Sequence, residues 1–466
     1  MKSSRPVLLI DFGSTFTKVI AVDVNRERVI GRAAAPTTVE TDICLGLQEA
    51  LDKLGKDLPQ VQGYSLRLAA SSAAGGLRMV AVGLVPELTA EAARRAALGA
   101  GARVLASYSY ELTEKEVEEI IGLDPDVVLL SGGTDGGHRK AVVHNIRTLA
   151  FSSLSAPVVY AGNKAVSDLA LKVFRRAGKE VRVTENVMPR LGEIQVEPAR
   201  ETIRRVFMER IIQARGLDGA LKLVDGLLMP TPAAVLKAAE LLALGTGEED
   251  GLGDLVVVDV GGATTDVHSV GQGLPTVEGV VLKGLREPRV KRTVEGDLGV
   301  RVSAPALLEA VGVQALGSEV GVDGVDLAEA VLELAEKRDK LPDTETGYQV
   351  DAALARVAVR EAVKRHAGRL QILDTPFGTA YFQYGKDLTG IKFLVGTGGV
   401  LVHAPDPAGI LQAGLFNPGE PTVLTPKDPV LLLDQKYLLA AAGLLAEFYP
   451  QQALRILKKS LKRVKL

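Results

Sequence analysis

The sequence predicts an α/β protein in which one large unit occurs twice and a small doubly wound parallel sheet is inserted into the first copy. Three observations predict this fold: a short motif recurs far along the chain, strands and helices alternate between its two copies, and glycine is abundant. Glycine makes up 49 of the 466 residues, which is above the usual share of about 7%. Because glycine collects where a backbone turns sharply or approaches a ligand closely, this excess directs attention to the loops.

The N-terminal segment has the pattern of a strand meander, and strands then alternate with helices. Short Val- and Ile-rich runs broken by turn residues predict three strands and a helix, at Val7–Ile10, Thr17–Asp23, Arg28–Ala35 and Asp42–Leu54. Five more strands, separated by single helices, predict the parallel sheet. They are Leu77–Leu84, Arg103–Ala106, Asp126–Leu130, Pro157–Tyr160 and Val181–Val183, with helices at Glu87–Leu98, Thr113–Ile121, His138–Leu149 and Lys164–Arg176.

Two helical patterns and an acidic, glycine-rich connector lead into the second half of the chain. The helices are expected at Glu197–Arg215 and Pro232–Leu244, the connector at Glu248–Gly253, and a restart of the meander at Leu255–Asp259. Ser303–Leu370 has a mostly helical pattern, Lys392–Val395 that of a strand, and the apolar run Tyr437–Ala446 that of a buried helix. We therefore expect the first domain to begin at 1–76, to contain an inserted subdomain at 77–184, and to be completed by a helical connection at 185–250. The second domain is expected at 251–436, with a helical insertion at about 303–370, and C-terminal helices are expected at 437–466.

The composition limits the classes of protein to which the chain can belong. The 55 Lys and Arg residues nearly balance the 57 Asp and Glu residues, which argues against a general nucleic-acid binder because such proteins carry a large basic excess. The single cysteine, Cys44, cannot close an intrachain disulfide and indicates a reducing compartment. No segment has the pattern of a signal peptide or a membrane span. We therefore expect a cytoplasmic protein without nucleic-acid or membrane partners.

The most informative feature is a loop that occurs twice. The segments Asp11-Phe-Gly13-Ser14-Thr15-Phe-Thr17-Lys18-Val19 and Asp259-Val-Gly261-Gly262-Ala-Thr264-Thr265-Asp266-Val267 share Asp, Gly, Thr and Val at the same four offsets. The two aspartates are 248 positions apart (259 − 11). Each copy follows an apolar strand and leads into another, so a large unit is expected to occur twice.

A loop of this kind suits a phosphate with its magnesium ion. An Asp at a strand end can hold Mg²⁺ through water molecules, and the backbone amides of a glycine turn form a concave site for an anion. The hydroxyls of Ser14, Thr15, Thr264 and Thr265 add donors, and Lys18 adds a positive charge. For a single copy, a hairpin turn in which Asp and Gly serve geometry alone is the alternative; two copies at matched spacing favour phosphate.

A third glycine cluster follows a later strand and precedes a short helical pattern. It reads Leu394-Val-Gly396-Thr397-Gly398-Gly399, and its glycines would let a flat ring or a phosphate lie directly on the backbone near a helix start. The sequence contains no Walker lysine loop, Rossmann fingerprint, zinc-protease helix or nucleophile-elbow serine.

Two Asp–Gly hairpins followed by a late Gly-Thr-Gly-Gly cluster resemble the actin-like ATPase superfamily, which includes sugar kinases and heat-shock chaperones. The resemblance implies duplicated ribonuclease-H-like domains around a nucleotide cleft, with ATP or ADP and Mg²⁺ as cofactors. It implies that Asp11 and Asp259 bind hydrated Mg²⁺ and help to orient the attacking water. The residues that it assigns to the nucleotide are Gly13, Ser14, Thr15, Thr17, Lys18, Gly261, Gly262, Thr264, Thr265, Gly396, Thr397, Gly398 and Gly399.

Four phrases narrow the resemblance to the glutamate-mutase accessory family, called GlmL or MutL. They are Leu130-Ser-Gly-Gly-Thr-Asp-Gly-Gly137, Asp259–Asp266, Thr293-Val-Glu-Gly-Asp-Leu-Gly299 and Gly396–Gly399. The similarity runs along the whole chain. It implies a chaperone-like factor that uses ATP to release damaged cobalamin from an adenosylcobalamin-dependent mutase or aminomutase, its protein partner. The identity of the mutase, direct contact with cobalamin, a second subunit and homo-oligomer formation stay open.

Several alternatives remain open at this point. A small-molecule kinase of the same superfamily would need a carboxylate base beside a substrate hydroxyl, and an actin-like filament ATPase would need self-complementary surfaces. The loop Gly132–Gly137 is either a ligand crevice at a strand end or a turn with unusual φ values, and the inserted sheet is either a mimic of a mutase subunit or an ordinary elaboration. We expect His268 to be a strand residue, and Glu295 and Asp297 to belong to a turn.

Overall fold

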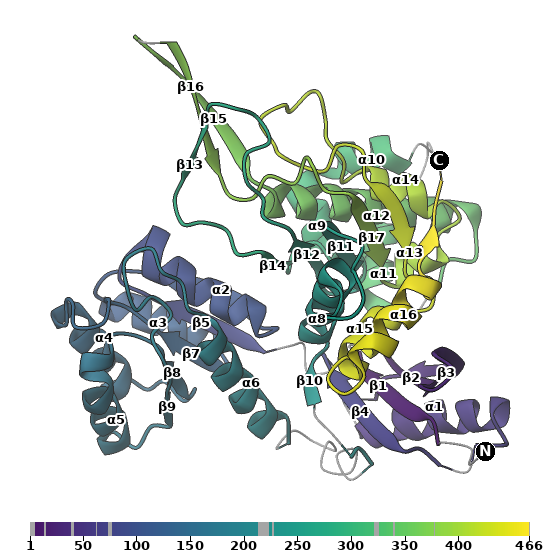
Figure 1. Ribbon diagram of the computed structural model, residues 1–466, viewed down its shortest axis with the longest axis horizontal. Coiled ribbons are helices and arrows are strands. Elements are labelled where there is room, and N and C mark those ends of the chain that lie inside the picture. Colours follow the sequence, from purple (N-terminus) through teal and green to yellow (C-terminus); the bar gives the residue numbers. More distant parts are fainter. Residues whose placement is uncertain are drawn as a thin grey trace. The chain divides into compact units, whose positions relative to one another are not determined.

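The computed structural model describes residues 5–13, 15–38, 42–61, 63–72, 77–212, 223–225, 228–320, 326–338, 341–376 and 378–465. The chain divides into two compact units (Figure 1). Unit 1 comprises Met1–Ala73, Arg215–Lys283 and Glu287–Leu466, and unit 2 comprises Ala74–Ala214 and Gly284–Arg286. Within the described ranges no helix is both long enough and apolar enough to span a bilayer.

The first sheet of unit 1 contains both strands of the N-terminal hairpin. Its strand order is β10-β4-β1-β2-β3, in which β1, β2 and β3 are antiparallel neighbours and β1, β4 and β10 are parallel. The strands are β1 (Val7–Phe12), β2 (Phe16–Asp23), β3 (Arg28–Pro36), β4 (Leu66–Ser71) and β10 (Leu228–Pro230), and α1 (Ile43–Asp57) lies between β3 and β4 in the chain.

The second sheet of unit 1 repeats the first. Its order is β14-β12-β11-β17-β18-β19, again with three antiparallel strands followed by two parallel additions, and β19 then closes the edge. The strands are β11 (Leu255–Val260), β12 (Thr265–Val270), β14 (Val290–Glu295), β17 (Phe393–Thr397), β18 (Val430–Leu433) and β19 (Lys462–Arg463). Because two sheets share one unusual strand order, the expected duplicated, ribonuclease-H-like fold is confirmed.

Two helices join the sheets into one core. The first is α8 (Thr231–Leu244), which directly follows β10, and the second is α15 (Leu438–Leu445), which comes after β18. All eight residues of α15 are buried, as expected for the apolar run noted in the sequence. A shared cluster of buried side chains includes Leu9 of the first sheet, Val257 of the second and Leu439 of α15. α16 (Pro450–Ser460) packs on the same core, and β19 then adds a strand to the expected helical C-terminus.

A second core lies on the other face of the second sheet. It is covered by the helices of the predicted insertion, which are α9 (Ala304–Val311), α10 (Val313–Val320), α11 (Leu327–Glu336) and α12 (Glu345–His366). The short helices α13 (Gly399–His403) and α14 (Pro407–Gln412) complete it. A separate three-stranded sheet of order β13-β16-β15 is formed by Val280–Lys283, Gly378–Tyr384 and Arg369–Thr375.

Unit 2 contains the parallel sheet that the sequence predicts. The order β6-β5-β7-β8-β9 with parallel pairing throughout is that of a doubly wound fold. Its strands are β5 (Arg78–Val82), β6 (Arg103–Tyr108), β7 (Val127–Leu130), β8 (Val158–Tyr160) and β9 (Val181–Val183). The helical segments are η1 (Pro86–Ala90, π-helical), α2 (Glu91–Gly99), α3 (Glu114–Gly122), α4 (Lys140–Phe151), η2 (Lys164–Val166, 3₁₀), α5 (Ser167–Arg176) and α6 (Glu197–Ile212).

The division into two compact units groups one helix differently from the division expected from the sequence. Helix α6 groups with unit 2, whereas we expected residues 185–250 to complete the first domain. The reason is visible in its contacts: Arg204 donates to the carbonyl of Gly99 at the end of α2 (3.5 Å), and Glu209 pairs with Arg182 of β9 (2.7 Å). The finer division of the chain into five segments stays a prediction.

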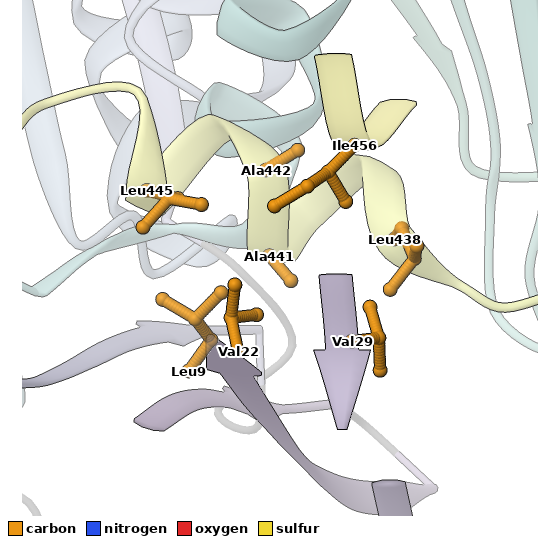
Figure 2. Close-up of a pocket in the computed structure, with 8 residues that line it drawn as sticks. All are labelled: Leu9, Val22, Val29, Leu438, Ala441, Ala442, Leu445 and Ile456. Atoms are coloured by element: carbon orange, nitrogen blue, oxygen red, sulfur yellow. The ribbon is translucent and has the colours of Figure 1, made fainter. Parts of the chain in front are cut away.

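A small apolar cavity marks where the first sheet meets the C-terminal helices. Figure 2 shows Leu9, Val22 and Val29 of the sheet on one side and side chains of α15 and α16 on the other. Ala441 and Ala442 of α15 lie at this contact, and their small size leaves the space open.

Gly443 and Gly55 give a matched pair of glycine variants for testing the helix crossing. A methyl group at Gly443 in α15 would overlap the backbone of Ala234 in α8, whereas Gly55 in α1 has open space. We expect Gly443→Ala to lower the free energy of unfolding by about 1–3 kcal/mol because the helices must move apart. Gly55→Ala should raise it by about 0.5–1 kcal/mol. Urea unfolding of both variants measures the difference, and a stabilised Gly443→Ala protein would contradict the close crossing.

Candidate functional site

The first hairpin places Asp11 near the end of β1, beside Lys18 of β2. The two residues are register partners, and the Lys18 ammonium lies 3.8 Å from the Asp11 carboxylate. On its other side Asp11 accepts a short hydrogen bond from the hydroxyl of Thr231 (2.6 Å), the first residue of α8. The turn closes through a bond from the amide of Gly13 to the carbonyl of Phe16 (3.1 Å). A methyl group at Gly13 would come within 2.7 Å of that oxygen.

The second hairpin reproduces this turn at Asp259. The amide of Gly261 donates to the carbonyl of Thr264 (2.9 Å), which is the equivalent bond at the same offset. Asp259 and Asp266 are register partners on β11 and β12, and Asp266 is buried in an ion pair with Arg292 (2.5 Å). Asp266 of this hairpin therefore has a cationic partner on β14.

The turns of the two hairpins lie close together within unit 1. A methyl group built on Gly262 would be 3.8 Å from the hydroxyl of Thr15, which is ordinary van der Waals distance. The pKa of Asp259 is raised to about 7, first by loss of hydration and then by the charge of Asp266. Asp11 and Asp434 contribute to this rise, and Lys18 opposes it. The structure thus brings Asp11, Lys18 and Asp259, from two distant segments of the chain, into one electrostatic cluster.

The third glycine cluster lies beside Asp259 on the next strand. Thr397 of β17 is the register partner of Asp259, and its hydroxyl donates to Asp434 (3.4 Å), which directly follows β18. Gly398 has φ of 104° and its Cα lies against the backbone of Val260, so no larger residue fits there. The carboxyl ends of β11, β17 and β18 therefore present Asp259, Thr397 and Asp434 along one edge of the second sheet.

Sequence reasoning missed three residues of this cluster. Asp434 accepts the amides of Leu438 and Leu439 (both 2.9 Å) and so caps α15, while burial raises its pKa. The ring of Tyr437 lies under the Lys18 ammonium (4.6 Å), and burial, followed by the charge of Asp259, raises the pKa of Tyr437 to about 12. Thr231 is the third. Asp434 had a signal, since Val430-Leu-Leu-Leu-Asp434 repeats the apolar run and aspartate of Val7-Leu-Leu-Ile-Asp11.

Some predicted nucleotide contacts are engaged elsewhere in this structure. The hydroxyl of Thr17 is buried against Thr37 (3.0 Å), and that of Thr265 is buried and donates to the carbonyl of Leu298 (2.7 Å). Gly396 packs against the side chain of Leu411, and Thr264 donates to Asp266 (3.0 Å). Ser14 lies outside the described residues. The assignment of these residues to a nucleotide stays a prediction.

The chemistry of the cluster fits a hydrated Mg²⁺ ion. The carboxylates of Asp266, Asp11 and Asp434 all disfavour the charge on Asp259, and the Lys18 ammonium opposes them; a divalent cation would reduce this repulsion. In the described part of the chain, no three His, Cys, Asp or Glu side chains gather closely enough to enclose a metal. Mg²⁺ needs no such cage, because it keeps several waters and commonly uses one or two carboxylates together with substrate phosphates.

The other residues that the sequence brought into question lie outside this cluster. His268 is a fully buried residue of β12, and loss of hydration lowers its pKa to about 3, in agreement with a strand residue. Glu295 and Asp297 both bind Arg365 of α12 (2.9 and 2.8 Å).

The loop 132–137 in unit 2 is built as a cross-linked turn. Gly132, Gly133 and Gly136 have positive φ. Asn163 joins the two arms of the loop, because its backbone amide donates to the carbonyl of Gly132 and its side chain accepts the amide of Gly136. Asn186 donates to Asp135 within the loop (3.0 Å). These features explain its glycines without a ligand.

The unequal surroundings of Asp259 and Asp266 predict opposite effects of removing each charge. The pKa of Asp259 is raised, from about 3.9 unfolded to about 7 folded, so its ionisation opposes folding increasingly between pH 4 and 7. Asp259→Asn should therefore stabilise the metal-free protein at pH 8 by about 1–3 kcal/mol, and the gain should vanish below pH 4. Asp266→Asn removes the carboxylate that binds the buried Arg292 guanidinium and should cost about 3–5 kcal/mol. Urea unfolding at pH 4, 6 and 8 without Mg²⁺ or nucleotide gives both values. If Asp259→Asn is less stable than the wild type at pH 8, groups within the protein stabilise the ionised carboxylate, and the expected burial penalty is contradicted.

Comparison with known proteins assigns the chain to a family. The MutL protein family model matches residues 7–461, and Protein MutL of Clostridium tetanomorphum is 52% identical over 458 residues, covering 98% of this chain and 99% of that protein. Two solved structures are similar at a low level. One is a ROK hexokinase from Thermus thermophilus, with 14% identity and a TM-score of 0.28, covering 97% of this chain and 99% of that one. The other is a glycerol dehydratase reactivase, with 11% identity and a TM-score of 0.34, covering 95% of this chain and 99% of that one. With TM-scores below 0.5, the assignment rests on the sequence matches. The chain with these repeated hairpins and sheets therefore belongs to the MutL protein family.

Proposed function

We propose that this protein is an ATP-dependent, chaperone-like reactivating factor for an adenosylcobalamin-dependent mutase or aminomutase, acting in the cytoplasm. In this proposal, hydrolysis of ATP drives a domain motion that releases damaged cobalamin from the partner enzyme. The observation that carries the nucleotide part is the meeting of two equivalent Asp–Gly hairpins, from segments 248 positions apart (259 − 11), at one carboxylate cluster. The sequence resemblance to the glutamate-mutase accessory family supports the choice of partner.

The residues of the cluster would divide the work of binding Mg²⁺ and ATP. Asp11 and Asp259 would hold the ion through its waters, and the ion would neutralise charge on the phosphates. The backbone turns at Gly13–Thr15 and Gly261–Thr264 would face the phosphates, while Lys18 would add a positive charge. The Gly396–Gly399 segment would carry the adenosine. Thr231 acts as a positioning residue, because its hydrogen bond fixes the orientation of the Asp11 carboxylate.

The closeness of the two turns supports a motion during the cycle. Between Gly262 of one turn and Thr15 of the other there is room for about one methyl group. A methyl group is smaller than a phosphate. A triphosphate bound between the turns at this point therefore requires them to separate. Binding and release of nucleotide would then change the relation of the two sheets that carry the hairpins, and this change is the motion we assign to reactivation.

The nucleotide part of the proposal predicts a specific order of variants in an ATPase assay. Asp11→Asn and Asp259→Asn should each lower kcat by about 100-fold or more, because each removes a carboxylate that holds the metal. Thr231→Val should lower kcat about tenfold, the equivalent of one lost hydrogen bond of about 1.4 kcal/mol, and Thr231→Ser should restore it. Asp23→Asn, at the far end of β2 on the same hairpin, is the control and should match the wild type. Wild-type rates in the Asp11 and Asp259 variants would rule out this site.

The partner part is tested by recovery of an inactivated enzyme. A purified adenosylcobalamin-dependent mutase is first blocked with hydroxocobalamin, and this protein, Mg²⁺, ATP and fresh coenzyme are then added. We expect mutase activity to return with ATP and not with a non-hydrolysable analogue, and to be lost with Asp11→Asn. ATP hydrolysis without recovery of any mutase would contradict reactivation. Stoichiometric ADP formation on addition of a metabolite would instead identify a small-molecule kinase, and sedimenting ATP-dependent polymers would identify a filament protein.

A further inference from the structure

The small sheet β13-β16-β15 exposes apolar side chains on both of its faces. Register pairing places Ile372 opposite Tyr381, and Tyr381 opposite Val280, on one face. Val281 and Phe382 are paired on the other face. The exposed fractions are 52% for Val281, 50% for Ile372 and 46% for Tyr384. Figure 1 shows the β15–β16 hairpin extending away from the rest of unit 1.

Such exposure is unusual for a sheet of this size. A three-stranded sheet is stable in water when one face packs on a core, and single exposed apolar residues on a surface need no explanation. Here the exposed apolar side chains are neighbours on three adjoining strands, which is the pattern of an interaction site. Among the strands in the described ranges, β13 pairs with β16 alone, so its outer edge can accept a further strand.

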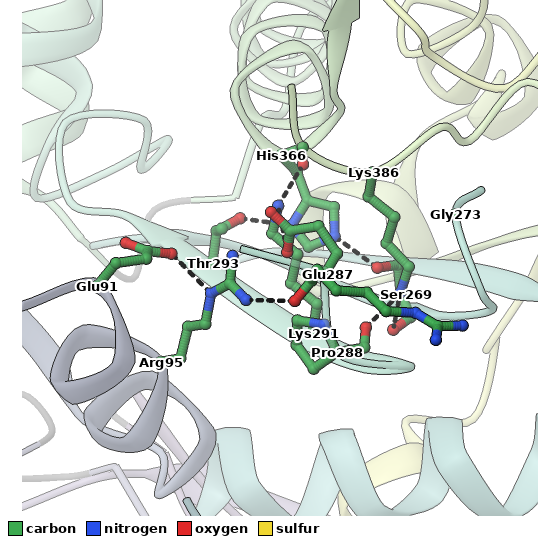
Figure 3. A network of polar contacts seen from close by, with 12 residues as sticks. Glu91, Arg95, Ser269, Gly273, Glu287, Pro288, Lys291, Thr293, His366 and Lys386 are labelled. Atoms are coloured by element: carbon green, nitrogen blue, oxygen red, sulfur yellow. Dashed lines mark hydrogen bonds and ion pairs between the residues drawn. The ribbon is translucent and has the colours of Figure 1, made fainter. Parts of the chain in front are cut away.

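The base of this sheet is held firmly, so the exposed surface is presented by a fixed element. Lys386, two residues after β16, is fully buried and donates to the carbonyls of Ser269, Pro288 and Arg289 at 2.8–3.3 Å (Figure 3). Gln383 of β16 donates to the carbonyl of Gly273 (2.9 Å). Gly273 itself, at φ of 62°, touches the Lys386 side chain and leaves no room for a larger residue. The neighbouring His366 is fixed on both ring nitrogens, by Ser269 and Thr293 (both 2.8 Å).

The charges beside the apolar surface indicate what it binds. Tyr384 is the register partner of both Lys283 and Arg369, so two cations flank it at the base of one face. Among the described residues neither cation has an acidic partner; Lys283 lies over the ring of Phe382 (4.8 Å). A complementary surface would place Asp or Glu side chains next to apolar ones.

We propose that the sheet β13-β16-β15 is the docking surface for the protein partner of this chain, which contacts it through an apolar segment bordered by Asp or Glu side chains. The inference rests on the proposed function, because the partner is the mutase that this protein would reactivate. An extended segment of the partner can pair with the edge of β13, where its side chains cover Val281 and a carboxylate meets Lys283. Leu373 and Arg369 lie on β15, at the opposite edge of the sheet, and are covered by a neighbouring part of the same partner surface.

The test is binding of the purified mutase to full-length protein in the presence of ADP and of ATP, measured by biolayer interferometry. Two variants address the surface: Lys283→Glu with Arg369→Glu reverses the charges, and Val281→Thr with Leu373→Thr removes apolar groups while keeping strand-forming residues. Each pair should weaken binding at least tenfold, and the charge reversal should also slow association at low salt. Leu332→Gln, an equally exposed apolar residue of α11, is the control and should bind as the wild type does.

Two further measurements keep the outcomes distinct. The ATPase rate of every surface variant should equal that of the wild type, since none of these residues belongs to the nucleotide cluster. Amide exchange of the wild-type protein should slow at 280–283 and 369–384 when the mutase is added. If the wild type binds the mutase but the variants bind equally well and exchange is unchanged, the docking surface is overturned and the proposed function stands. If the wild type binds no mutase in any nucleotide state, both are overturned. A wild-type dimer that dissociates in the variants would show that a second copy occupies the surface, and would also overturn the proposal.

Discussion

The crossing of α8 and α15 is the contact on which the rest of unit 1 depends. At Gly443 the backbone of α15 lies directly on the carbonyl of Ala234 in α8, with no space for a side chain between them. Each helix follows the last parallel strand of one repeat, β10 for α8 and β18 for α15. Their contact therefore joins the two duplicated sheets into a single buried cluster. Separate sheets would each expose an apolar face, so the duplication yields one stable unit only through this crossing.

The same two helices also begin at the carboxylate cluster. The first residue of α8, Thr231, binds Asp11, and the cap of α15, Asp434, lies within the electrostatic field of Asp259. The residue that directly follows the last parallel strand is Thr231, a hydroxyl donor, in the first repeat and Asp434, a carboxylate, in the second. The first repeat stabilises its aspartate, and the second crowds its aspartate with negative charge. Loss of hydration is the largest cause of the raised pKa of Asp259, and the charge of Asp434 in the second repeat adds to it.

How much of this could be predicted depends on how far apart the interacting residues lie in the chain. The two hairpins were predictable because each is a contiguous motif, with Asp, Gly and Thr at fixed offsets. The parallel sheet of unit 2 was predictable because its inner strands β7 and β8 are short, fully buried apolar runs. The bond between Thr231 and Asp11 joins residues 220 positions apart and leaves no local pattern. The strands β13, β15 and β16 were missed for a different reason. Their apolar residues lie on both faces, so the alternation that identifies a half-buried strand is absent.

The additional elements enter the chain at places that leave the carboxylate cluster and the helix crossing intact. The inserted unit 2 enters between β4 and β10 of the first repeat, β13 enters between β12 and β14 of the second, and β15 and β16 enter between α12 and β17. None of these insertions interrupts a hairpin turn, the three strand ends that carry Asp259, Thr397 and Asp434, or the start of α8 or α15. Additions at those places would displace a carboxylate or separate the crossing helices, whereas additions at the observed places leave both intact. Elements outside the duplicated frame can therefore differ freely in surface chemistry, and they are where contacts specific to one partner are to be expected.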